Sequence, residues 1–232
     1  MKKITLLFVL LSVNIFAQAP AIEWQKCLGG FNTETAGEID KTPDGGYIIA
    51  GTSNSTNGSV TGNHGGYDYW VVKLDATGNI LWQKSLGGSG IDNAYSIKST
   101  SDGGCVVAGL SFSTDGNVTG NHGDFDYWVV KLDATGNIQW QKSIVGLGVD
   151  VAYDIQNTSD GGYVVAGLSR SNGGNVTGNH GNDDYWIVKL DATGNIQWQK
   201  SLGGSSWDGA YAIQTTSDGG YIVAGNSQSN DG

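Results

Sequence analysis

The chain has 232 residues, a formal net charge of −10 and only 12 lysine and arginine residues. Nucleic-acid binding needs clustered cationic side chains that neutralise phosphates, so this composition argues against a nucleic-acid partner. The 38 glycines and 2 prolines, with Asn, Asp, Ser and Thr between apolar runs, predict an all-β fold of short strands and tight turns. The acidity suits a cation, a glycan or a basic protein surface as partner, or simply the solubility of a secreted protein.

Residues 1–18 have the pattern of a secretory signal peptide. They begin with Lys2 and Lys3, continue as an apolar run from Ile4, and end near the small residue Ala17. The apolar run is too short for a membrane span. We therefore expect a secreted protein, or one on the outer cell surface, with no membrane span after the signal peptide is removed.

The two cysteines are expected to stay unpaired, although an exported protein could join them in a disulfide. Cys27 stands where other copies of an internal repeat have serine, as at Ser85. Cys105 stands where they have tyrosine, as at Tyr47. Each cysteine is thus interpreted as a substitution within a strand.

An internal repeat of 58 residues runs through the chain without slippage. The repeated tryptophans are Trp24, Trp82, Trp140 and Trp198 in one set and Trp70, Trp128 and Trp186 in another. A unit that recurs in a fixed frame, about three and a half times, indicates a repeat architecture in which neighbouring copies bury each other's faces.

Each unit contains four strand-like runs. In the third copy they cover 152–158, 162–169, 185–190 and 196–202. The first two are separated by an Asp-Gly pair, a hairpin signal that predicts a primed turn with glycine at positive φ. The last two flank the turn 191–195, in which Gly194 is expected in the left-handed conformation.

The inner runs are apolar on both faces and the outer run alternates, a gradient that suits a four-stranded antiparallel blade between neighbours. We therefore predict a β-propeller with blades at about 36–87, 94–145 and 152–203, a partial blade at 210–232 and a lone outer strand at 22–28. A β-solenoid and a row of small sandwiches are the alternatives. The third strand of one blade is missing, so an incomplete ring belonging to a longer protein is expected.

The segment Leu190–Trp198 (LDATGNIQW) resembles the blade signature of quinoprotein-like propellers, in which a glycine turn precedes a tryptophan that docks between blades. The whole unit, with its DGGYIVAG-like and GNxxWQK-like runs, also resembles uncharacterised secreted β-propeller repeats of Bacteroidota, including clients of type IX secretion. This resemblance implies the fold, export and a C-terminal sorting domain in the rest of the protein. It does not imply an activity.

Acidic residues recur at two places in the loops of one propeller face. The first set is Glu34, Asp92, Asp150 and Asp208, and the second is Asp68, Asp126 and Asp184. Carboxylate oxygens are ligands that calcium prefers, so the second set is a candidate calcium site and the first a candidate binding surface. The alternative is that each carboxylate caps a turn by accepting nearby backbone N–H groups. No other cofactor is expected.

Two further features of the loops are candidates for function. His64, His122 and His180 occur once per copy without a second metal-ligating residue at suitable spacing, so they are expected to fix their own loops by hydrogen bonds. Trp207 stands outside the repeated tryptophan positions. It is interpreted either as an exposed contact for sugar or protein, or as packing beneath its loop.

These patterns favour a non-enzymatic secreted or cell-surface module that binds a glycan or a protein at its loop face. No catalytic constellation, nucleophile elbow or phosphate-binding loop is visible, and only the loop segments are expected to differ between copies. The alternatives are a quinoprotein-like or hydrolytic enzyme with an axial site, and a purely structural spacer. Open blade edges also predict self-association.

Overall fold

The computed structural model describes residues 19–122 and 124–232, and all regular secondary structure within them is β. The expected signal peptide lies outside the described residues. Within the described ranges, no helix is long and apolar enough to cross a membrane.

The chain forms three four-stranded antiparallel sheets and one two-stranded sheet, each from one copy of the repeat. The first sheet consists of β1 (Glu34–Lys41), β2 (Tyr47–Ser53), β3 (Asp68–Leu74) and β4 (Ile80–Leu86). The second consists of β5 (Asp92–Ser99), β6 (Cys105–Ser111), β7 (Asp126–Leu132) and β8 (Ile138–Ile144). The third consists of β9 (Asp150–Asn157), β10 (Tyr163–Ser169), β11 (Asp184–Leu190) and β12 (Ile196–Leu202), and the fourth of β13 (Asp208–Thr215) and β14 (Tyr221–Ser227).

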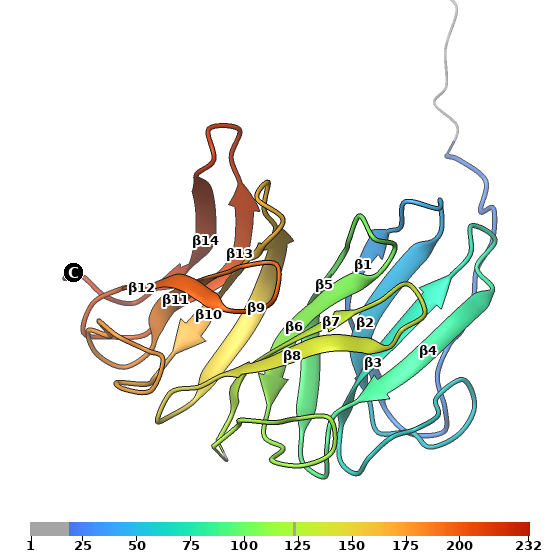
Figure 1. The fold of residues 1–232 in the computed structure, drawn as a ribbon, viewed down its shortest axis with the longest axis horizontal. Helices are drawn as coiled ribbons and strands as arrows, with labels where there is room; N and C mark the ends of the chain where they lie inside the picture. The colour runs from blue at the N-terminus through green and yellow to red at the C-terminus, as the bar shows by residue number, and fades with distance from the viewer. Residues whose placement is uncertain (1–18, 123) are drawn as a thin grey trace, which may run out of the picture.

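The sheets stack as consecutive blades of an incomplete propeller, as the sequence predicts. The first strand of each blade packs against the first strands of its neighbours, which makes β1, β5, β9 and β13 the innermost strands. Figure 1 shows the row running from the blue and cyan first blade to the red β13–β14 pair, without the two ends meeting. A blade apolar on both faces requires a neighbour on each side, so stacking is the source of the core.

The predicted outer strand at 22–28 is not formed, because no third strand lies beside it to supply the ladder hydrogen bonds. The segment nevertheless keeps the packing of its repeat position. Trp24 donates from Nε1 to the carbonyl of Ala76 at 3.2 Å, as Trp82 donates to Ala134 at 3.0 Å. The tryptophan therefore docks on the turn of the next blade with or without strand pairing.

The hairpins are confirmed, but the predicted primed turn between the first two strands is wrong. Gly45 has a φ of 84°, whereas Asp44 has a negative φ, which a type I′ turn does not allow. Thr42 pairs with Gly46 across the loop, and Gly45 donates to the carbonyl of Thr42. This is a type I turn followed by a left-handed glycine. In the other turn, Gly194 has the expected positive φ of 83°.

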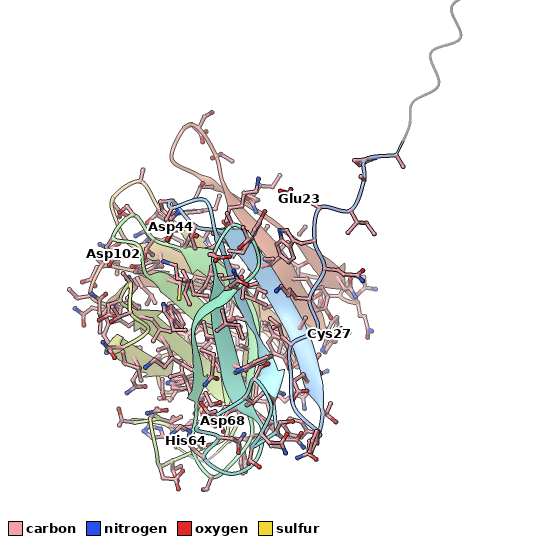
Figure 2. All side chains as sticks on the ribbon, turned by 90° about the vertical axis from the view of Figure 1, so that its right-hand side faces the viewer. Glu23, Cys27, Asp44, His64, Asp68 and Asp102 are labelled. Carbon is pink, nitrogen blue, oxygen red and sulfur yellow. The ribbon has the colours of Figure 1, made fainter. Side chains whose placement is uncertain are left out.

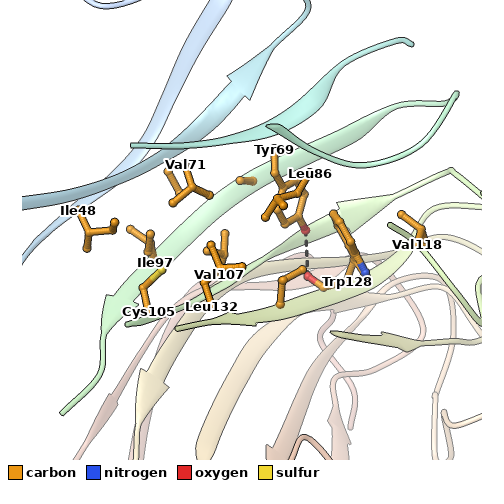
Figure 3. Packing of buried hydrophobic residues seen from close by; sticks show 13 residues of the cluster. Ile48, Tyr69, Val71, Leu86, Ile97, Cys105, Val107, Val118, Trp128 and Leu132 are labelled. Carbon is orange, nitrogen blue, oxygen red and sulfur yellow. Dashed lines mark hydrogen bonds between the residues drawn. The ribbon is translucent and has the colours of Figure 1, made fainter. Parts of the chain in front are cut away.

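The interblade core joins apolar side chains of adjacent sheets (Figure 3). Tyr69 is buried in it and donates its hydroxyl to the carbonyl of Trp128 at 2.9 Å, and Tyr127 donates to Trp186 in the same way. Cys105 lies buried in this core while the Cys27 side chain is exposed, and both are free, which confirms the expected absence of a disulfide.

Candidate functional site at the loop face

The loop face is the end of the row where the innermost and third strands begin. Figure 2 shows His64 and Asp68 at this end, while Asp44 and Asp102, in the short hairpin turns, lie at the opposite end. The loops between the second and third strands, such as 54–67, gather here. The face therefore carries the longest loops between strands in the part of the chain that the structure describes.

The recurrent acidic residues lie at this face, each as the first residue of a strand, whereas the sequence predicts them in loops. Glu34, Asp92, Asp150 and Asp208 begin the innermost strands, and Asp68, Asp126 and Asp184 begin the third strands. The six aspartates are at most 1% exposed. Each third-strand aspartate lies near the innermost-strand aspartate of the next blade, as Asp184 and Asp208 do on either side of Gly203. The carboxylates thus form buried pairs between blades.

The hydrogen bonds of these carboxylates hold the loops in place. Asp92 accepts from the N–H of Gly88 at 2.9 Å, from the hydroxyl of Ser113 at 2.8 Å and from the hydroxyl of Ser111. Asp208 accepts from Gly204 at 2.9 Å in the same arrangement. These contacts are those expected if the carboxylates cap the loops that enter the innermost strands.

The junction between the second and third blades departs from this pattern. Val145 replaces the glycine found at position 87, and the N–H of Gly146 donates to Asp126 Oδ1 at 3.1 Å, whereas the equivalent N–H of Gly88 donates to Asp92. Burial raises the pKa of Asp126 to about 6. Burial, together with the neighbouring Asp126 carboxylate, raises the pKa of Asp150 to about 7. This pair therefore titrates near neutral pH.

The loop histidines act as the sequence predicts where their contacts are described. His64 Nδ1 lies 2.7 Å from Asp68 Oδ2, and His180 Nδ1 lies 2.6 Å from Asp184 Oδ2. Within 19–122 and 124–232, no group of three or more His, Cys, Asp or Glu side chains is arranged to hold a metal ion. Calcium binding by Asp68, Asp126 and Asp184 stays a prediction.

Trp207 is half-buried and packs against an apolar cluster at the axial side of the loop face. The cluster contains Leu110, Val151 and Leu168, and the Trp207 ring centroid lies 6.3 Å from that of Tyr211. The side chain thus packs under its loop and leaves part of its ring exposed, and its contact with a sugar or a protein stays a prediction.

A row of tyrosines along the innermost strands was missed by sequence reasoning. Tyr95, Tyr153 and Tyr211 each stand at a β-bulge, where the innermost strand carries one residue more than its partner. Their ring centroids are 5.4 Å apart from Tyr95 to Tyr153 and 4.9 Å from Tyr153 to Tyr211. The first blade has Gly37 at this position. Bulges reorient side chains and are common beside functional sites.

The next residue of the first three innermost strands, which is Glu38, Ser96 or Asp154, belongs to a polar chain across the junctions. Glu38 accepts the N–H of Ile97 at 2.9 Å and the hydroxyl of Ser96, and Asp154 accepts the N–H of Ile213 at 2.7 Å. The expectation that only loops differ between copies is therefore wrong. Aligning the copies at positions 38, 96, 154 and 212, which hold Glu, Ser, Asp and Ala, would have revealed the difference.

Comparisons with known proteins agree with the fold and leave the function open. No family model matches the chain. It is 31% identical over 169 residues to the regulatory protein FlaEY of Caulobacter vibrioides, a match that covers 65% of this chain and 17% of that protein. A crystal structure of a protein of unknown function from Bacteroides caccae has a similar fold, with a TM-score of 0.50 and 11% identity over 82% of this chain and 53% of that one.

The expected likeness to uncharacterised proteins of Bacteroidota is thus confirmed at the level of the fold. The type IX secretion and quinoprotein-like parts of the resemblance stay predictions. The chain spans less than two thirds of the length of either protein.

Proposed function

We propose that this chain is a non-enzymatic binding module, exported through its N-terminal signal peptide, that presents its loop face to a glycan or a protein. The observation that carries this proposal is a contrast between copies. The turns, the docked tryptophans and the buried strands repeat, whereas the axial side of the loop face varies among the copies. One repeat position there holds Thr52, Leu110, Leu168 and Asn226 in turn.

The polar groups on the axis support binding rather than catalysis. Glu38 and Asp154 accept backbone N–H groups of the neighbouring blade, and Glu38 also pairs with Lys98. A general acid or nucleophile must be available to a substrate. Here the carboxylates hold adjacent blades together. The partly exposed aromatic rings are therefore the groups on the axis that can contact a ligand.

The experiment is a binding screen with residues 19–232 on a glycan array and against a set of immobilised proteins. Tyr95→Ala tests the axial tyrosines, and Trp198→Ala is the control, because Tyr95 is half-buried on the innermost strand β5 and Trp198 is 40% exposed on the outer strand β12. We expect the Tyr95 variant to lose binding while the Trp198 variant keeps it. Equal loss in both variants, or new reducing ends in the glycans, would argue for a different function.

A further inference from the structure

A hollow of about 370 Å³ opens between the first and second blades at the loop face. It lies between the loop-face ends of β1 and β5 and is closed on one side by the residue that precedes β3. Its polar lining consists of Thr33, Thr35, Thr52, Tyr67, Asn93 and Tyr95. The volume is at the lower end of the range of small-ligand sites, roughly 300–1,000 Å³.

The corresponding space at the later junctions is filled. Where the first junction has Thr52, the second and third have Leu110 and Leu168, each buried with 6% of its surface exposed. The counterpart of Asn93 is Val151, which packs in the same apolar cluster. The second and third junctions are therefore closed and apolar at this place, whereas the first junction is open and lined by hydroxyl groups.

The polar groups of the hollow have no partner in the described residues, yet their backbone is fixed. The side chains of Thr33, Thr35, Thr52 and Asn93 form no hydrogen bond within 19–122 and 124–232. The carbonyl of Tyr67 accepts the N–H of Asp92 at 2.6 Å, which ties the residue before β3 to the start of β5. Hydrogen-bond donors and acceptors are thus held in position without partners among the described residues.

An aromatic ring stands at the axial end of this row of polar groups. Tyr95 has the ring of Tyr153 on one side, and on the other the chain has Gly37 in place of a further tyrosine. Among the residues that the structure describes, one side of the Tyr95 ring is consequently left without an aromatic neighbour. An aromatic ring packs against apolar C–H surface, and the hydroxyl and amide groups beside it both donate and accept hydrogen bonds.

From this combination we infer that the hollow binds a small neutral saccharide. This inference rests on the proposed function and names its ligand class. A sugar ring offers C–H groups on its faces and hydroxyls on its rim, which match an aromatic ring flanked by threonine and asparagine. No charged side chain lines the hollow and the chain carries a net charge of −10, so an anionic ligand is disfavoured.

The test replaces the first junction with residues that the protein itself uses at the second. The triple variant Thr52→Leu, Tyr67→Phe and Asn93→Val introduces the side chains of Leu110, Phe125 and Val151. Because this set already packs at the second junction, the variant is expected to fold. The control is Phe125→Tyr, which makes the reverse change at the second junction.

The probes are neutral cello-, malto-, xylo-, manno- and chito-oligosaccharides of two to six sugars, titrated into residues 19–232 by calorimetry and saturation-transfer NMR. We expect at least one to bind, with affinity reduced about tenfold or more in the triple variant and unchanged in the control. Equal affinity in the triple variant would overturn the hollow as the site and leave the binding module intact. Protein binding without saccharide binding would overturn the inference alone, and no binding of either class would overturn both proposals.

Discussion

Tyr127 and Tyr185 occupy the same repeat position but differ in what their hydroxyls meet. The Tyr127 hydroxyl crosses to the next blade and donates to the carbonyl of Trp186 at 2.9 Å. The fourth blade has no described third strand to offer Tyr185 the same acceptor. We expect Tyr127→Phe to lower the free energy of unfolding by about 1–2 kcal/mol and Tyr185→Phe to lower it much less. Urea unfolding of both variants measures the difference, and equal losses would contradict the interblade role of the bond.

Asp150 should make the stability of the protein depend on pH near neutrality. Its pKa is about 7 in the folded protein against 3.8 for an ordinary aspartate, so the folded state prefers the protonated carboxyl. This group therefore weakens the fold as pH rises from about 4 to 7, and the full penalty remains above pH 7. One pKa unit is worth about 1.4 kcal/mol. The advantage of Asp150→Asn over the unsubstituted protein in free energy of unfolding should therefore grow by a few kcal/mol between pH 4 and pH 8.

Asp133 provides the control of opposite sign. Hydrogen bonds from Asn137 and Thr135 hold its pKa at about 2, so its carboxylate stabilises the fold above pH 4, and this contribution is lost as the pH falls towards 2. Asp133→Asn should thus destabilise the protein most at high pH. The melting temperatures of both variants, relative to the unsubstituted protein, are measured across pH 3–8. If both differences change with pH in the same direction, burial of Asp150 does not govern the pH dependence of stability.

At the scale of one element, the turn before each outer strand is a docking platform for the tryptophan of the preceding blade. Gly136 has a φ of 80°, and a Cβ atom there would lie 2.9 Å from the ring of Trp82. Gly120 has a φ of 81° and no atom within 4 Å of such a Cβ. Both alanine variants are destabilised by about 1–2 kcal/mol because alanine must adopt the left-handed conformation, but only Gly136→Ala also displaces the tryptophan. We expect a clearly larger fall in melting temperature for Gly136→Ala, and similar falls would refute the docking.

The strands and hairpins could be predicted from the sequence because periodicity and Asp-Gly pairs act locally. The type of the first turn could not, since a primed turn and a type I turn followed by glycine use the same residues. The prediction of a strand at 22–28 was wrong because a strand needs a neighbouring strand to pair with. The periodicity of a segment contains no information about whether such a partner is present. Burial of Asp68 and Asp92 depends on the approach of two blades, and the open first junction depends on side chains such as Thr52 and Asn93 that differ among otherwise matching copies.

At the scale of the whole molecule, each blade is covered by its neighbours. The ends of the described row therefore expose apolar side chains and free strand edges. In the second and third blades, β6 and β10 are buried along their whole length. Their counterpart β14 is mostly exposed and pairs only with β13 in the described residues, and Ile222 on it is 63% exposed. A free strand edge with an apolar side chain invites pairing with another chain.

Light scattering of residues 19–232 over a range of concentrations tests most directly whether stacking between blades governs this molecule. We predict a mass that rises with concentration as β14 edges pair. Appending a second copy of residues 170–194, which carry a loop and a third strand, should reduce this association by covering the edge. A stable monomer at all concentrations, with both ends resistant to protease, would contradict an open row of mutually dependent blades.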